Sequence, residues 1–271
     1  MSGLLFGCDF SSAPSRRKPI VVARGAVDGV CVTLQGLDTF DTLDGWGGWL
    51  ARTPVWTGGF DFPFGLPREL VVELGWPLQW PALMSYYAAL TRGEIRTAFA
   101  AFCAARPAGG KFAHRATDGP AGSSPSMKWV NPPVAFMLHA GVPRLVAAGA
   151  HLPGLHAPAG AATRIALESY PGLLARELIG RRSYKADDRK RQTPERARAR
   201  LDLLDALATG SRRLGLRLVL DAAQRRALLA DAQGDLIDSV LCLLQTAWAS
   251  RQPAWGLPAV IDPLEGWIVS A

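Results

Sequence analysis

The sequence predicts an α/β fold, in which a mixed β-sheet of three antiparallel strands followed by parallel strands is flanked by helices. Two observations lead to this prediction. Short apolar runs joined by turn residues occupy the first 35 positions, and later apolar runs alternate with segments of helical periodicity. With 271 residues, 49% of them hydrophobic, the chain can bury a substantial core.

The first three strands are predicted from a meander. Residues 3–10 are apolar on both faces, as in a central strand. Residues 19–25 and 30–35 follow, and Asp28-Gly29 between them favours a tight hairpin. Short connections of this kind join antiparallel neighbours.

A helix and a fourth strand come next. Thr39 is a candidate N-cap for a helix over residues 40–51, where large apolar side chains recur at helical spacing. Residues 54–61 then form an apolar run that ends in an acid. The order is therefore strand, strand, strand, helix, strand.

Residues 65–160 change in character and are predicted to be an insertion. Helical patches at 82–90 and 94–105 precede a stretch rich in Gly, Pro and Ser from 107 to 133. We expect this mostly helical and loop-rich segment to line or cover a site within a single domain of residues 1–271.

The C-terminal part resumes the alternation of strands and helices. The predicted elements are a strand at 164–169, helices at 172–179, 194–208, 221–232 and 235–249, and a terminal strand at 266–269.

Five acids are the candidate catalytic residues. Asp9, Asp61 and Glu168 each close an apolar run predicted to be a strand, and Asp235 and Asp238 share one face of the last long helix. A carboxylate in such surroundings is costly unless a cation or hydrogen-bond donors compensate it. Acids that converge from distant parts of the chain indicate a divalent-metal site.

Each acid also has a structural interpretation. Asp9 precedes two serines and is placed to cap a turn, Asp61 is placed to end a strand through backbone hydrogen bonds, and Asp235 follows a glycine as a natural N-cap. Glu168 has Arg164, Arg176 and Lys185 as potential ion-pair partners. Asp238 lies one turn inside an apolar helix, where capping is not available to it.

The predicted order of elements describes a ribonuclease H-like architecture, with the first strand central and the fourth parallel beside it. Asp9 and Asp61 would then lie side by side at one edge of the sheet, and Asp235 and Asp238 would approach them from a packed helix. Asp9, Asp61 and Asp238 are the predicted ligands of Mg²⁺ or Mn²⁺. Two such ions can activate water and stabilise the leaving oxygen in phosphodiester cleavage.

Five short blocks resemble the signature blocks of the domain-of-unknown-function family 429 (DUF429). They are GCDFSS at 7–12, GFDFPFG at 59–65, ESYP at 168–171, DLIDSVL at 235–241 and EGWI at 265–268. That family is regarded as predicted nucleases of the ribonuclease H-like superfamily, so the resemblance implies a metal-dependent hydrolase. The DxxD pattern at 235–238 is also similar to that of RuvC-type resolvases. The chain differs from those resolvases in having Asp and not Glu at 61, in the insertion at 65–160, and in the additional acid Glu168.

The balance of charge favours an anionic partner. The net charge is +7, and half of the 30 lysines and arginines lie between Arg176 and Arg226. Lys128, Arg181, Arg182 and Lys185 are the candidate substrate-binding residues. An ordinary solvated helix face is the alternative interpretation of the basic tract.

Several functional classes of protein are excluded or disfavoured because their sequence motifs are missing. No P-loop, HExxH, GxSxG or dinucleotide-binding motif occurs. The four histidines lack metal spacing, and His114 is a candidate proton carrier. No apolar run is long enough to span a membrane, and the four cysteines form no CxxC pair, so we expect a cytoplasmic protein with reduced thiols.

The leading prediction is a metal-dependent nuclease or phosphodiesterase acting on DNA or RNA. One alternative is nucleotide-binding phosphotransfer or hydrolysis of the actin-like kind, which needs a second set of three strands, expected within 65–160 if present. The other is a non-catalytic nucleic-acid-binding protein. The sequence gives no oligomeric state.

Overall fold

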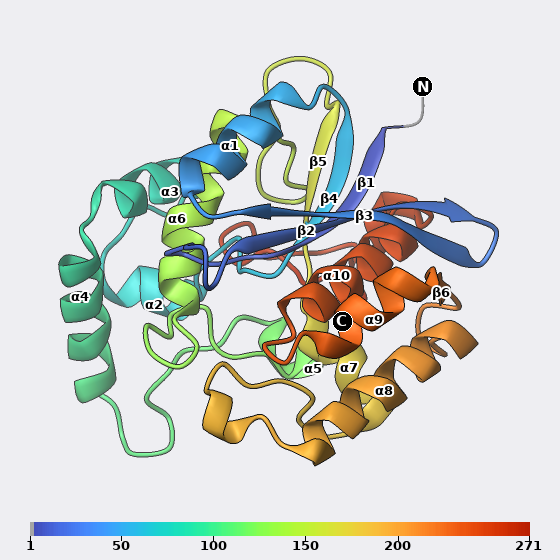
Figure 1. Ribbon diagram of the computed structural model, residues 1–271. Coiled ribbons are helices and arrows are strands. Elements are labelled where there is room, and N and C mark those ends of the chain that lie inside the picture. The colour runs from blue at the N-terminus through green and yellow to red at the C-terminus, as the bar shows by residue number, and fades with distance from the viewer. Residues whose placement is uncertain (1–2) are drawn as a thin grey trace.

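Six strands form one mixed sheet in the computed structural model, which describes residues 3–271 (Figure 1). They are β1 (Leu4–Asp9), β2 (Ile20–Asp28), β3 (Cys31–Phe40), β4 (Trp56–Phe60), β5 (Arg164–Glu168) and β6 (Arg217–Val219). The order across the sheet is β5-β4-β1-β2-β3-β6. β1, β2 and β3 are antiparallel, whereas β4 is parallel to both β1 and β5. The predicted α/β sheet, antiparallel and then parallel, is confirmed.

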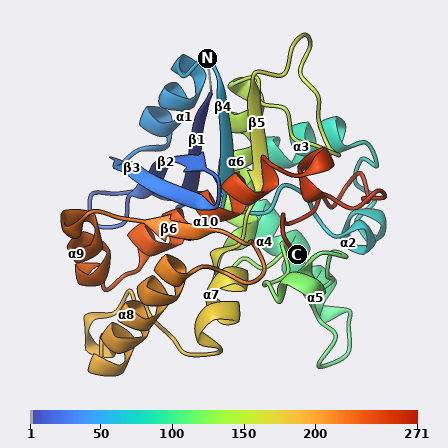
Figure 2. The ribbon, with the colours of Figure 1, turned by 90° about the vertical axis from the view of Figure 1, so that its right-hand side faces the viewer.

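Helices cover both faces of the sheet (Figures 1 and 2). In chain order they are α1 (Leu43–Arg52), α2 (Arg68–Glu73), α3 (Trp80–Ala89), α4 (Arg92–Ala104), α5 (Asp118–Ala121), α6 (Val134–Ala147), α7 (Pro171–Ile179), α8 (Pro194–Thr209), α9 (Ala222–Ala230) and α10 (Asp235–Ala249). α1 and α6 lie on one face, and α10 crosses the other face with α7, α8 and α9 beyond it. No helix within residues 3–271 is long and apolar enough to cross a membrane.

Two local predictions were wrong, and one strand was missed. Thr39 is not a helix cap, because β3 continues to Phe40 in pairing with β2, and Thr42 caps α1 instead, accepting a hydrogen bond from the Gly45 N–H. Residues 266–269 make only one bridge to β5, since positive φ angles at Gly266 and Ser270 interrupt an extended conformation. The three-residue strand β6, parallel to β3, was not predicted.

Two glycines bring α10 directly onto the sheet. Gly7 in β1 and Gly59 in β4 are register partners on the face that α10 covers. A Cβ atom at Gly7 would collide with the α10 backbone at Ser239 and Leu243, and one at Gly59 would collide with the side chain of Thr246. These glycines therefore set how closely the helix approaches the two strands, and with it the position of the helical acids.

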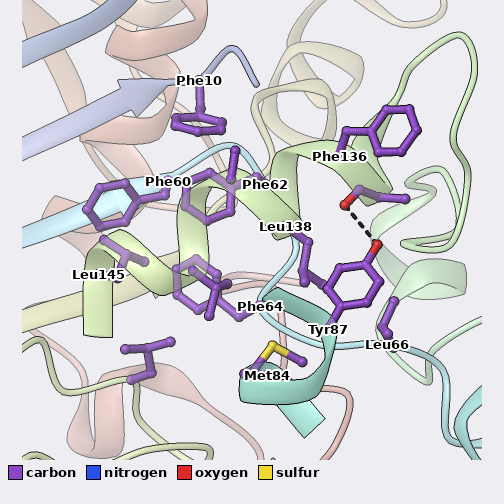
Figure 3. Close-up of a cluster of buried hydrophobic side chains, with 14 of the residues drawn as sticks. Phe10, Phe60, Phe62, Phe64, Leu66, Met84, Tyr87, Phe136, Leu138 and Leu145 are labelled. Carbon is purple, nitrogen blue, oxygen red and sulfur yellow. Dashed lines mark hydrogen bonds between the residues drawn. The ribbon is translucent and has the colours of Figure 1, made fainter. Parts of the chain in front are cut away.

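An aromatic core fills the opposite face and joins the insertion to the sheet (Figure 3). Phe10 follows β1 directly, and Phe60, Phe62 and Phe64 alternate from the end of β4 into the following loop. The four rings pack against one another with centroids 4.6–6.2 Å apart. Tyr87 of α3 is buried in the same core and donates a hydrogen bond to the backbone oxygen at the start of α6.

The segment 65–160 contributes helices α2–α6 and loops, and within the described chain it contains no strand beyond isolated bridges at residues 151, 152 and 156. Its apolar residues belong to the same hydrophobic cluster as the strands β1, β2 and β4. The second set of three strands that the actin-like alternative needs is therefore absent from this part of the structure.

Candidate metal centre

Asp9, Asp61 and Asp238 form a cluster of three carboxylates. One oxygen atom from each lies within 4.8 Å of the others. Asp238 is fully buried, whereas Asp9 and Asp61 are partly exposed toward solvent. The geometry is that of a site open on one side, with three oxygen ligands of the type that hard divalent cations prefer.

Strand register and helix packing explain why these acids meet. Asp9 is the last residue of β1, and Asp61 follows β4 directly, with its N–H donating to the backbone oxygen of Cys8 at 3.0 Å. Side chains alternate along a strand, so both acids point to the same face as Gly7 and Gly59. That is the face on which α10 places Asp238, one turn from its start.

Burial and mutual repulsion disfavour ionisation of the cluster. Burial and the Asp238 carboxylate raise the pKa of Asp61 to about 7, an effect that Lys185 opposes. Burial, followed by Asp238 and Asp235, raises the pKa of Asp9 well above its usual range. A divalent cation would relieve both contributions, since it replaces lost solvation and screens the like charges.

Lys185 and Tyr184 contact the cluster from the loop after α7. The Tyr184 hydroxyl donates to one oxygen of Asp238, and the Lys185 ammonium pairs with the other. Burial by itself would lower the pKa of Lys185. The neighbouring Asp238 carboxylate outweighs this effect and raises the pKa of Lys185 well above its usual range. Gly234 permits this approach, because a Cβ atom there would lie 2.7 Å from Cβ of Lys185.

The other two predicted acids occupy different positions. Asp235 is the first residue of α10, and the N-cap is Gly234, so Asp235 does not cap the helix. It lines the same cavity as Asp9 and Asp61, and burial raises its pKa to about 6. Glu168 is buried at the end of β5 and is not part of the three-carboxylate cluster.

Arg115 neutralises Glu168, a partner that the sequence did not suggest. Its guanidinium donates to both Glu168 oxygens, at 2.7 and 2.9 Å, and to Asp118 at 3.0 Å. The Phe64 N–H also donates to Glu168, at 3.0 Å. Arg164, Arg176 and Lys185, the partners expected from the sequence, bind elsewhere. Arg115 lies in a glycine-rich, proline-rich loop without periodicity, so no sequence pattern identified it.

Three cavities meet at the cluster, and Asp61 and Lys185 line all of them. The first, of about 510 Å³, runs along α7. The second, of about 290 Å³, lies against the insertion, and the third, of about 810 Å³, contains Asp9 and Asp235. Asp61 therefore lies where the three cavities adjoin, and together these cavities form a groove between the insertion on one side and the loop after α7 on the other.

The candidate substrate-binding residues are distributed unequally. Arg181 and Arg182 line the cavity along α7, and Lys185 lines all three, whereas Lys128 is half-buried and lines none of them. His114 is exposed and also lies outside these cavities.

Much of the basic tract is engaged in structural contacts. Arg198 and Arg182 both pair with Asp202, and Arg200 is buried, donating to the Tyr184 backbone oxygen at 2.8 Å. Only part of the tract therefore faces the groove.

Comparison of the chain with models of protein families, with curated proteins and with solved structures found no match in any of the three. The arrangement of the residues themselves is therefore the basis for a functional assignment.

Proposed function

We propose that the protein is a divalent-metal-dependent nuclease, a hydrolase of phosphodiester bonds in nucleic acid, with Asp9, Asp61 and Asp238 as ligands of Mg²⁺ or Mn²⁺. The observation that carries the proposal is the convergence of three carboxylates within 4.8 Å at the junction of a groove. When bound, the ion supplies Lewis-acid activation of water and of the phosphate.

The chain's own residues would fix the geometry of this chemistry. Asp238 is held by the Tyr184 hydroxyl, so its orientation is set before a ligand arrives. Lys185 places a positive charge beside the carboxylates, where a phosphate group of the substrate would lie. Asp235, in the same cavity, is positioned to orient water.

The fold adds support. The order β5-β4-β1-β2-β3, with three antiparallel strands and two parallel ones, agrees with a ribonuclease H-like arrangement, to which β6 is an addition. The short blocks that resemble DUF429 imply the same class and contain the three ligands, together with Glu168 and Asp235. Within this proposal, Glu168 is a buried structural acid that fixes the end of β5 to the insertion.

Nucleic acid is the proposed substrate because the groove combines a cation site with unpaired arginines. Arg191 and Arg196 line the cavity that contains Asp9, and neither has a carboxylate partner within 4.0 Å in residues 3–271. The net charge of +7 strengthens attraction to a polyanion.

Cleavage of labelled DNA and RNA oligonucleotides, with Mg²⁺, with Mn²⁺ and with a chelator, tests the proposal. We expect metal-dependent cleavage that Asp9→Asn and Asp238→Asn each reduce by at least about 100-fold, because each removes a charged ligand. Asp44→Asn is the matched control, since that side chain is 96% exposed on α1. Wild-type levels of cleavage in both cluster variants would refute the mechanism.

A further inference from the structure

The cavity along α7 combines an aromatic ring with a free guanidinium group. Its lining includes Asp61, Tyr170 at the N-terminal end of α7, and Arg181 just beyond the C-terminal end of that helix. Its volume of about 510 Å³ is in the range of cavities that hold a small organic ligand. It also shares Asp61 and Lys185 with the other two cavities, so a chain-like ligand can continue past the carboxylates.

The Tyr170 ring is held in a fixed orientation beside the carboxylate cluster. It lies against Gly172, where a Cβ atom would be 2.7 Å from the Tyr170 hydroxyl oxygen. The Arg176 guanidinium lies over one face of the ring, 5.4 Å from its centroid, and donates to the hydroxyl at 3.5 Å, so a base can stack only on the other face. The ring remains partly exposed and lines two cavities together with Asp61. Arg176 and Gly172 therefore hold the ring in place, and the part of it that they leave uncovered faces the cavities.

Arg181 differs from its neighbour Arg182 in being free. Arg182 donates to Asp202 at 2.6 Å and to the Ile179 backbone oxygen at 3.1 Å. Arg181 is exposed and has no carboxylate within 4.0 Å in the described part of the chain. An unpaired arginine in the lining of a cavity is suited to a phosphate group.

These two features restrict the form of the substrate. The face of a base can stack on an aromatic side chain only when the base is unpaired, because in a duplex both faces are covered by neighbouring base pairs. A ring located beside the catalytic carboxylates, within the groove, is thus suited to a base from a single strand or an unpaired end.

We propose that the cavity along α7 binds one nucleotide of single-stranded nucleic acid next to the bond that is cleaved, with its base stacked on Tyr170 and its outer phosphate bound by Arg181. This inference rests on the proposed function and adds the substrate class to it. DNA and RNA share the chemistry involved, so both enter the test.

Fluorescence anisotropy measures the affinity of the full chain for a fluorescein-labelled single-stranded oligonucleotide of about 12 nucleotides. The assay contains Ca²⁺ as the ion that the carboxylates bind. We expect Tyr170→Ala to weaken binding on the order of 10-fold, while Tyr170→Phe, which keeps the ring, stays within about 2-fold of wild type. Tyr86→Ala is the control, since that ring is 42% exposed on α3 and lines none of the groove cavities.

Abasic substitutions in the oligonucleotide separate stacking from a structural role of the ring. Moving one abasic site along the strand should reveal a position at which wild-type affinity falls and at which Tyr170→Ala causes no further loss. Equal losses at every position, or equal weakening by Tyr170→Phe and Tyr170→Ala, would overturn the stacking assignment.

The phosphate contact has its own prediction. Arg181→Ala should weaken binding to all sequences alike and reduce the slope of log affinity against log salt by about 1, whereas the exposed Arg96→Ala on α4 should leave both unchanged. Duplex of the same sequence should bind more weakly than either single strand. If metal-dependent cleavage occurs but duplex is preferred and Tyr170→Ala binds like wild type, the inference fails while the nuclease proposal stands. Absence of cleavage from every substrate would instead overturn the nuclease proposal.

Discussion

Replacing Asp61 with asparagine should stabilise the metal-free protein at alkaline pH. The substitution keeps the size of the side chain but removes one charge from a cluster of three carboxylates. Burial and the charge of Asp238 raise the pKa of Asp61 from its ordinary value of 3.8 to about 7. The folded protein therefore holds the proton more tightly than the unfolded chain does.

The sign of the pH dependence follows from this difference. Below about pH 4, Asp61 is protonated in both the folded and the unfolded state. At such pH values its charge therefore does not lower the free energy of unfolding. As the pH rises to about 7 and above, the unfolded chain ionises freely while the folded protein must place a charge beside Asp238, so the free energy of unfolding falls. At about 1.4 kcal/mol per pKa unit, the rise from 3.8 to about 7 sets a ceiling of about 4 kcal/mol.

Thermal unfolding of wild type and Asp61→Asn, at about pH 4 and about pH 8 in a chelator, measures this effect. Because Lys185 and the other acids share the interaction, we expect a gain of about 2–4 kcal/mol for the variant at the higher pH. For a chain of this size, that is a rise in melting temperature of roughly 4–16 °C. The variants should have nearly equal melting temperatures at the lower pH.

Addition of Mn²⁺ or Mg²⁺ should stabilise the wild type more than the variant. The wild type gains about 2.7 kcal/mol when the ion is present at 100 times its dissociation constant, and the variant, with a ligand charge removed, gains less. The exposed Asp44→Asn should behave as wild type throughout. A wild type that is unaffected by either ion, together with a variant no more stable at about pH 8, would refute the reasoning about the cluster.

Three substitutions away from the cluster test the surrounding structure by urea denaturation. Glu168→Gln leaves Arg115 buried without its full counter-charge and should lower the free energy of unfolding by about 3 kcal/mol. If this variant instead has reduced cleavage activity and unchanged stability, Glu168 belongs to the catalytic site. Gly7→Ala forces a methyl group into the backbone of α10 and should cost at least about 3 kcal/mol, whereas a neutral result would contradict the close contact of helix and strand. Tyr87→Phe leaves the backbone oxygen of Ala135 without its donor and should cost about 1–2 kcal/mol, and no change would imply that water replaces the hydroxyl.

The sequence predicted the frame of the sheet and three members of the cluster because these depend on local patterns. Alternation and turn residues located β1, β2, β3 and β4, and acids at strand ends are conspicuous after apolar runs. Helix boundaries were less predictable. The α1 cap moved from Thr39 to Thr42 because pairing between β2 and β3 extends to Phe40, a contact that local propensity does not contain.

The sequence by itself thus determined which side chains carry charge and which strands end in acids. Only the tertiary structure decided the partners of these acids: it pairs Glu168 with Arg115 from a loop without pattern, and it brings Tyr184 and Lys185 to Asp238. The physical reason is that electrostatic partnership depends on distance and burial. In this protein both are set by how closely α10 lies on Gly7 and Gly59 and by how the insertion closes over the end of β5.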